Sequence, residues 1–196
     1  MKVYFFEKFR LVTKFINKTR FMQPKQQDHL VINVPAGTVK AKAIIEGEKV
    51  VQSSFVNVPS FLYLKDNTIE LGNFGSIKFD VSFGGAFYAI VDAGQLQLSL
   101  DQNNFEACIK LGREIKKAVM KSYDILHPVS KDLSFLYGTI FTGNAEQKNH
   151  HSRNVCIFAD GEVDRCPTGS GVSGRMAIHY LRNEIKIRVV VTLNIT

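Results

Sequence analysis

The chain has 196 residues, 45% of them hydrophobic, so it is long enough to bury a core as one ordinary domain or two small ones. This composition excludes a disordered chain. The formal net charge of +7 suggests an acidic partner, but residues 1–26 carry seven basic side chains against Glu7 alone, a surplus of six. The rest of the chain is close to neutral and contains no known nucleic-acid motif, so we predict no nucleic-acid surface.

Three cysteines, Cys108, Cys156 and Cys166, are widely spaced and form no C-x-x-C pair. Their odd number and spacing argue against a disulfide framework and a zinc site, and they favour a reducing, cytoplasmic compartment. No apolar run approaches the roughly 20 residues of a membrane-spanning helix. We therefore expect neither a metal nor a membrane partner.

Residues 4–22 place apolar side chains at near-helical spacing with basic residues between them, which predicts an amphipathic helix. From Leu30 to Ala89 the pattern changes to short β-rich segments separated by turns, and these predict an antiparallel sheet that curls into a barrel. The predicted strands are Leu30–Val34, Val39–Glu46, Lys49–Val58, Phe61–Lys65, Thr68–Leu71 and Ser76–Phe83. Gly84-Gly85 then interrupts a strand, which indicates a β-bulge or a nearby ligand.

A second helix follows Asn104 or Asp101, either of which can cap it, and Cys108 lies on its apolar face. Residues 135–142 return to a strand, and residues 144–154 are polar and predict a loop. The later segments are a short buried strand at Val155–Ala159, a helix after Thr168 that is apolar on nearly every side, and a strand within Ile185–Ile195.

Between the strand at Val155–Ala159 and the helix that follows it, the chain has Asp164-Arg165-Cys166-Pro167-Thr168-Gly169-Ser170-Gly171. The first N–H groups of a helix lack partners within the helix and carry partial positive charge, so they favour a carboxylate or phosphate. Gly169 and Gly171 let an anion approach that backbone. An ordinary glycine-rich turn with a Ser or Thr cap explains the same residues, and this alternative stays open.

This loop resembles the second signature of the proline racemase family, whose usual form is D-R-S-P-C-G-T-G, and the resemblance covers roughly residues 31–181. Thr168 stands where racemases and epimerases of the family carry their second catalytic cysteine. That exchange is the mark of the trans-3-hydroxy-L-proline dehydratase branch. The other matching stretches, in the family's order, are Phe83–Ala89, His127-Pro128 with Leu136–Thr142, and Asn154–Asp160.

The resemblance implies an α+β, diaminopimelate epimerase-like fold, in which β-barrel halves each surround a central helix and the active site lies between two pseudo-symmetric domains. Residues 1–85 would be a remnant of the first domain and residues 86–196 a partial second domain, incomplete at both ends. Leu11–Met22 would be the remainder of the first central helix. The family's motif at the start of that helix, M-C-G-H with the base cysteine, has no match in the chain.

The resemblance also implies a hydro-lyase without metal or organic cofactor, which removes the Cα proton of trans-3-hydroxy-L-proline and expels water to give pyrroline-2-carboxylate. Gly169 and Ser170 would bind the carboxylate of this small imino acid through backbone N–H groups. Asp164 would accept a hydrogen bond from the ring ammonium, Phe158 would line the pocket, and Thr168 would occupy the face of Cα opposite the base.

Several alternatives stay open. A proline racemase or hydroxyproline epimerase is disfavoured by Thr168, whereas the absence of M-C-G-H favours a catalytically inert fragment or binding protein. Unpaired sheet edges would favour association with another chain, including a homodimer. Gly169–Gly174 has the pattern G-x-G-x-x-G, but its distance from the preceding strand and the lack of an acidic residue near Asn194 disfavour a dinucleotide site. Cys166, beside the helix start, is an alternative thiol nucleophile.

Overall fold

The computed structural model describes residues 2–3, 30–46, 49–165, 168–186 and 193–195. The chain divides into two compact units, Met1–Pro59 and Ser60–Thr196. The amphipathic helix predicted over residues 4–22, which includes Leu11–Met22, lies outside the described residues, and so does Cys166. None of the helices in the described ranges is long and apolar enough to cross a membrane.

The first unit contains a four-stranded antiparallel sheet in the order β1-β4-β3-β2. Gly37, at the β2–β3 turn, has a φ of +131°, a backbone conformation that favours glycine. The strands predicted between Leu30 and Glu46 are confirmed, although β3 begins at Gly37. The strands of this unit are β1 (Lys2–Val3), β2 (Leu30–Val34), β3 (Gly37–Glu46) and β4 (Lys49–Val56).

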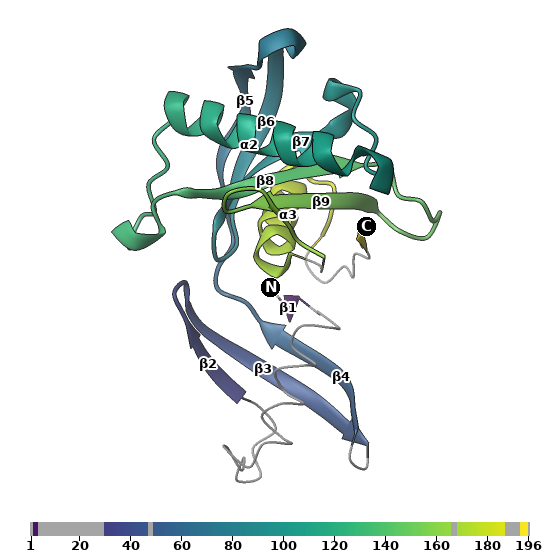
Figure 1. The fold of residues 1–196 in the computed structure, drawn as a ribbon. Coiled ribbons are helices and arrows are strands. Elements are labelled where there is room, and N and C mark those ends of the chain that lie inside the picture. The colour runs from purple at the N-terminus through teal and green to yellow at the C-terminus, as the bar shows by residue number, and fades with distance from the viewer. Residues whose placement is uncertain (1, 4–29, 47–48, 166–167, 187–192, 196) are drawn as a thin grey trace. The chain divides into compact units, whose positions relative to one another are not determined.

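The second unit is built on a seven-stranded sheet with the main order β10-β9-β8-β7-β6-β5, and β11 also pairs with β9 (Figure 1). Its strands are β5 (Phe61–Glu70), β6 (Ser76–Phe83), β7 (Phe87–Asp92), β8 (Leu136–Gly143), β9 (Ser152–Phe158), β10 (Glu162–Val163) and β11 (Leu193–Ile195). Its α-helices are α2 (Phe105–Ser122) and α3 (Gly169–Leu181), and its 3₁₀ turns are Gly72–Phe74, Ala93–Leu96, Gln102–Asn104 and Lys131–Leu133. The α+β class is therefore confirmed.

The expectation of a purely antiparallel sheet is wrong for β7 and β8, which run parallel. The long connection through α2 returns the chain to the other end of the sheet, which a short hairpin turn cannot do. Asp101 caps the 3₁₀ turn before α2, since its Oδ1 accepts the N–H of Asn103 at 2.8 Å. Cys108 lies on the buried face of α2 with 2% exposure, as predicted.

The turn predicted at Asp66-Asn67 is instead an irregularity within a continuous β5. The register of β5 against β6 shifts between Leu64 and Asn67, and Asp66 has a φ of +52°. The Asp66 N–H donates to Asp80 Oδ1 on β6 at 2.8 Å. A side chain of the neighbouring strand therefore satisfies the irregular backbone, and the strand continues past it.

Gly84-Gly85 forms the turn between β6 and β7, not a bulge within one strand. Phe83 pairs with Phe87, and Gly85 has a φ of +118°. A Cβ on Gly84 would lie 2.2 Å from the carbonyl oxygen of Ser170 in α3. The expected domain boundary after residue 85 falls within this hairpin, whereas the chain divides between residues 59 and 60. The assignment to two pseudo-symmetric domains stays a prediction.

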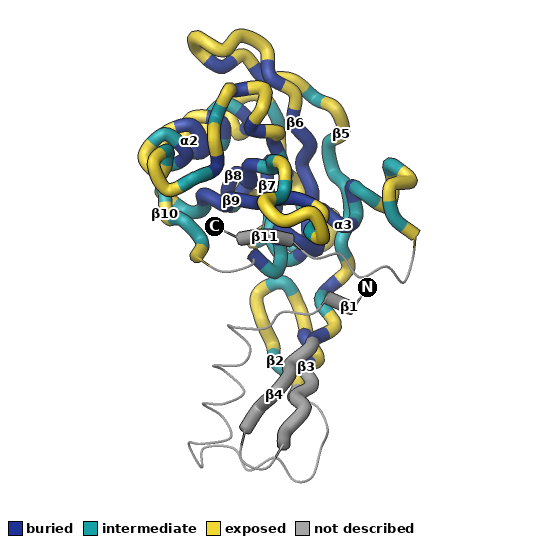
Figure 2. Tube along the Cα trace, turned by 90° about the vertical axis from the view of Figure 1, so that its right-hand side faces the viewer, coloured by how far each residue is buried: buried dark blue, intermediate teal, exposed yellow. Residues whose placement is uncertain are grey.

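The loop predicted for residues 144–154 ends earlier, because β9 begins at Ser152 and residues 153–154 pair with β8. Buried positions are concentrated on β6 to β9 and in α3 (Figure 2). The polar residues at the start of β9 are among them: Ser152, Arg153 and Asn154 are all at most 8% exposed. A polar sequence is thus part of the core here.

Helices α2 and α3 cover opposite faces of the sheet, as two adjacent residues of β8 show. Thr139 donates its hydroxyl to the carbonyl oxygen of Gly112 in α2 at 2.9 Å. Its neighbour Ile140 faces α3, where a Cβ on Gly171 would lie 2.3 Å from Ile140 Cδ1. Successive side chains of a strand point to opposite faces, so the sheet is sandwiched between the two helices.

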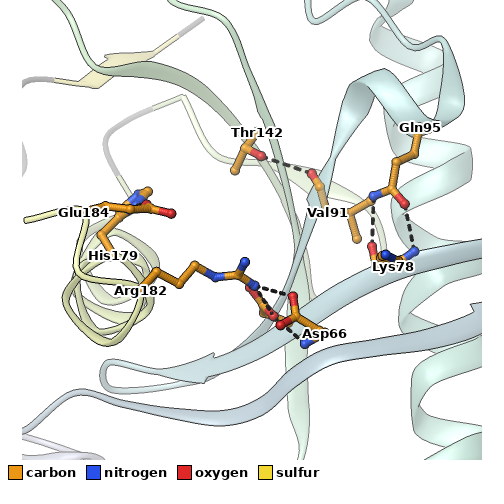
Figure 3. Close-up of polar contacts among 9 residues, drawn as sticks. Asp66, Lys78, Val91, Gln95, Thr142, His179, Arg182 and Glu184 are labelled. Carbon is orange, nitrogen blue, oxygen red and sulfur yellow. Dashed lines mark hydrogen bonds and ion pairs between the residues drawn. The ribbon is translucent and has the colours of Figure 1, made fainter.

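At the far end of α3, Arg182 holds the helix to β5 and β6 (Figure 3). Its Nη2 lies 2.6 Å from Asp66 Oδ1 and 2.8 Å from Asp80 Oδ2. Asp80 is the more enclosed carboxylate, with 12% side-chain exposure against 52% for Asp66. The pair with Asp80 therefore loses less of its strength to solvent screening.

A buried guanidinium holds α3 to β9. Arg175 is 3% exposed and donates to Asn154 Oδ1 and Ser152 Oγ, each at 2.9 Å. Burial lowers the pKa of Arg175 to about 10, so the group stays charged at neutral pH. Its hydrogen bonds therefore join one cation to two neutral acceptors of a single strand.

His179 lies between Arg175 and Glu184. The His179 Nε2 is 3.4 Å from Arg175 Nη2, and the His179 Nδ1 is hydrogen-bonded to Glu184. A guanidinium only donates, so we assign Nε2 as the acceptor and Nδ1–H as the donor to Glu184. Burial lowers the pKa of His179; the hydrogen bond to Glu184 opposes this shift, and the charge of Arg175 adds to it. The neutral imidazole is therefore the form that fits this network.

We expect Gly84→Ala to lower the free energy of unfolding by about 1–3 kcal/mol, because the new Cβ would collide with backbone atoms of α3 that cannot rotate away. Chemical denaturation measures this loss. Gly143→Ala is the matched control: its Cβ would meet Leu100 Cδ1 at 3.2 Å, the end of a flexible side chain. An equal loss in both variants would contradict the packing argument.

We expect the free energy of unfolding to fall as the pH drops below about 6.5, the ordinary pKa of histidine in an unfolded chain. The folded pKa of His179 is lowered, so the unfolded state takes up the proton first. The loss continues until the pH reaches the folded pKa. Denaturation across about pH 5 to 8 measures it. In His179→Gln, whose amide oxygen can still accept from Arg175, this part of the pH dependence should disappear; an unchanged profile would contradict the assignment.

Candidate functional site

The start of α3 leaves backbone N–H groups available. Thr168 occupies the N-cap position, and the N–H of Val172 closes the first turn by donating to the Thr168 carbonyl oxygen at 2.7 Å. The N–H groups of residues 169–171 precede that bond, and the Thr168 side chain does not cap them. This end of the helix therefore offers donors and partial positive charge to an anion.

The Thr168 hydroxyl is directed to Asp164 instead. Its Oγ1 donates to Asp164 Oδ2 at 3.0 Å, and Thr168 is 5% exposed while Asp164 is half-buried. The Asp164 N–H donates to the carbonyl oxygen of Cys156 at 3.0 Å, which ties the loop to β9. The alternative that the Thr168 side chain caps the helix is therefore wrong, because its hydroxyl connects the two ends of the loop.

Ser170, in the first turn of α3, contacts a buried tyrosine. Its Oγ lies 2.9 Å from the hydroxyl of Tyr88 on β7, and Tyr88 is 2% exposed. Burial raises the pKa of Tyr88 far above its usual value, and the negative charge of Asp164 is among the smaller contributions in the same direction. The phenol therefore keeps its proton at neutral pH, and it lies within electrostatic reach of Asp164.

Phe158, the last residue of β9, is half-buried and packs on Tyr137 with ring centroids 5.5 Å apart. Tyr137 meets Tyr88 edge-on at 5.8 Å. A Cβ on Gly138 would lie 2.8 Å from Phe158 Cα, so glycine lets β8 and β9 approach at this point. A row of three aromatic rings thus joins Phe158 to the hydrogen-bond partner of Ser170.

The structure brings four predicted site residues together at the start of α3 and connects the fifth to them through this aromatic row: Asp164, Thr168, Gly169, Ser170 and Phe158. Their roles stay predictions. The sequence interpretation assigned no role to Tyr88 and Tyr137. Both lie in stretches that resemble the family, and a hydroxyl-bearing aromatic residue in such a stretch was the available signal.

A recess of about 370 Å³ lies near the other end of α3 and is lined by acidic and basic residues that include Asp80, Arg175, His179 and Arg182. None of the predicted site residues lines it. Within the described part of the chain, no three His, Cys, Asp or Glu side chains are grouped so that they could hold a metal ion. The recess is therefore separate from the predicted site at the start of α3.

A family model described as proline racemase matches residues 9–191. The trans-3-hydroxy-L-proline dehydratase of Colwellia psychrerythraea is 48% identical over 164 residues, which cover 84% of this chain and 46% of that protein. The Bacillus cereus protein of the same name is 36% identical over 176 residues, which cover 90% of this chain and 52% of that protein. A 3-hydroxyproline 2-epimerase of Burkholderia multivorans is 38% identical over 151 residues, covering 77% and 45%.

Among solved structures, a hydroxyproline epimerase from Agrobacterium vitis with bound trans-4-hydroxy-L-proline superposes with a TM-score of 0.85 at 25% identity. The match covers 94% of this chain and 53% of that one. A probable proline racemase from Agrobacterium radiobacter gives a TM-score of 0.86 at 24% identity, covering 95% and 54%. The chain therefore spans about half the length of the relatives it matches.

We expect Thr168→Val to lower the free energy of unfolding by about 0.5–2 kcal/mol, because a half-buried carboxylate loses a hydrogen-bond donor. A double-mutant cycle with Asp164→Ala separates this contact from others that Thr168 makes. The two changes should be coupled, since each removes the same hydrogen bond, and Thr168→Ser should keep most of the stability. Additive losses would show that Thr168 acts independently of Asp164.

Proposed function

The chain belongs to the proline racemase family, and we propose that a protein carrying it dehydrates trans-3-hydroxy-L-proline to pyrroline-2-carboxylate. The observation that carries this proposal is the placement of Thr168, whose hydroxyl donates to Asp164 at the start of α3. Racemisation and epimerisation need a second proton carrier on the opposite face of Cα. A threonine hydroxyl hydrogen-bonded to a carboxylate is poorly suited to that task, because alcohols are very weak acids.

The proposal extends to the fold. We take the unit of residues 60–196 as a large part of one of two pseudo-symmetric halves of a diaminopimelate epimerase-like fold, with α3 as its central helix. Contacts between α3 and several strands of the sheet support this assignment. The residues that approach α3 are Ser82 on β6, Tyr88 on β7 and Asn154 on β9. The substrate would lie between this half and its counterpart.

In the proposed complex, the N–H groups of Gly169 and Ser170 bind the substrate carboxylate, Asp164 accepts a hydrogen bond from the ring ammonium, and Phe158 lines the pocket. A base removes the Cα proton, and the N–H groups stabilise the charge that develops on the carboxylate oxygens. Those electrons then form the Cα–Cβ double bond as the 3-hydroxyl leaves and, with a proton, becomes water. Thr168 positions Asp164 throughout this sequence.

The two cysteines in the described ranges are poorly placed to be that base. Cys108 and Cys156 are each 2% exposed. Cys108 lies on the buried face of α2, and Cys156 belongs to the same buried cluster as Tyr88. Burial also raises the pKa of the Cys108 thiol, which disfavours the reactive thiolate. We therefore propose that the base comes from a segment with the family's M-C-G-H motif. A homodimer of this sequence does not supply it, since each copy lacks the motif.

We expect this chain joined to a segment that supplies M-C-G-H to form pyrroline-2-carboxylate from trans-3-hydroxy-L-proline. The 196-residue chain alone should be slower by at least about 10²–10⁴-fold, the usual effect of losing a catalytic base. Chromatography of the product, with the reaction run in D₂O, measures both the dehydration and any exchange at Cα.

Two results would contradict the proposal. Epimerised hydroxyproline or racemised proline carrying deuterium at Cα would identify a second proton carrier, and the chain would then be part of an epimerase or racemase. Equal turnover with and without the M-C-G-H segment would place the base within these 196 residues. Cys166 is the first candidate in that case, and Cys166→Ala tests it.

A further inference from the structure

Tyr88 is a buried side chain that the structure joins directly to the hydroxyl of a proposed carboxylate-binding residue. It lies on β7, 82 positions before Ser170, and the two hydroxyl oxygens are 2.9 Å apart. The ring is enclosed by Ile140 and Cys156 and packs on Tyr137. Because these contacts leave the ring little freedom, the position of its hydroxyl is set by the core.

The direction of this hydrogen bond follows from burial. If Ser170 were the donor, the phenolic proton of Tyr88 would need a different acceptor. Within the described part of the chain, the hydrogen-bond partner of the Tyr88 hydroxyl is Ser170. An unsatisfied buried O–H is unfavourable. The raised pKa of Tyr88 keeps that proton in place at neutral pH. Tyr88 therefore donates, and Ser170 Oγ accepts.

We propose that Tyr88 is a positioning residue for carboxylate binding: by donating to Ser170 Oγ, it turns the Ser170 hydroxyl proton toward the start of α3 and makes that hydroxyl a donor to the ligand. This inference rests on the proposed function, because it assumes a carboxylate at the helix start. It extends that function by adding a side-chain donor, held in place from β7, to the backbone N–H groups.

Comparison with the neighbouring hydroxyls shows why the Ser170 hydroxyl needs a partner outside the helix to orient it. The Ser173 hydroxyl, one turn later, donates to the Gly169 carbonyl oxygen at 2.9 Å and is satisfied within the helix. The Thr168 hydroxyl is committed to Asp164. The Ser170 hydroxyl differs from the other two: in the arrangement assigned above, its oxygen accepts from Tyr88, which lies outside the helix, and its own proton can be donated to a ligand. Ser170 is half-buried, so part of this residue is open to solvent or a ligand.

The test is a titration of the ¹⁵N-labelled 196-residue chain with trans-3-hydroxy-L-proline, followed through the backbone amide signals of residues 169–171. We expect saturable shifts, and a dissociation constant about 3- to 10-fold higher in Tyr88→Phe, as for the loss of one oriented hydrogen bond to a charged group. Ser170→Ala should weaken binding at least as much. The double variant should bind no more weakly than Ser170→Ala, because Tyr88 acts through Ser170.

Tyr123→Phe is the matched control, because it removes a phenol that donates to the Thr68 carbonyl oxygen at 2.8 Å, away from α3. Its dissociation constant should stay unchanged. Additive effects of Tyr88→Phe and Ser170→Ala, or no saturable shift in the unaltered chain, would overturn the inference. Failure of the proposed function is a different result: if the products show epimerisation, the coupling between Tyr88 and Ser170 persists, since both reactions bind the same carboxylate.

Discussion

The candidate site depends on how closely the first turns of α3 approach the sheet. A Cβ on Gly84 would lie within 2.6 Å of two backbone atoms of α3, one on Gly174 would lie 2.5 Å from Ser82 Oγ, and one on Gly171 would meet Ile140 at 2.3 Å. Helix and sheet therefore touch at positions without side chains, which is a demanding form of close packing. Gly171 of the glycine-rich loop is therefore required for packing, because its missing side chain lets the first turn of α3 lie against Ile140.

The far end of α3 determines how the helix is rotated. Arg175 bonds to β9, while Arg182 bonds to β5 and β6, so the two guanidinium groups reach opposite parts of the sheet. Buried charge is weak evidence for stability, but it can select one arrangement over others because every alternative leaves a cation unsatisfied. Rotation of a helix about its axis moves every side chain at once.

The spacing of apolar residues was enough to predict most strands and both described helices, because it indicates whether an element buries one face or all of its faces. It failed where a contact distant in sequence overrides the local pattern. Asp66 looks like a turn, but Asp80 satisfies its backbone and β5 continues. Residues 152–154 look like a loop, but Arg175 donates to the side chains of Ser152 and Asn154 inside the core. For the site, family resemblance supplied the candidate residues, whose roles stay predictions, whereas the bond between Tyr88 and Ser170 spans 82 positions and could not be inferred from spacing.

The chemistry of this half-site is one-sided, and that limits the reactions it can serve. In the proposed site, backbone N–H groups and the Ser170 hydroxyl donate to the substrate carboxylate, and Asp164 accepts from its ring ammonium. The two described cysteines are both buried. In the proposed function, such an arrangement binds a zwitterionic imino acid and stabilises charge that develops on its carboxylate, while proton removal from Cα is assigned to a base outside the described residues. A thiol at position 168 would add a proton carrier on this side and permit inversion. Under the proposed function, threonine at this position, with its proton committed to Asp164, leaves expulsion of the 3-hydroxyl as the favoured outcome for the intermediate formed by a base on the opposite side.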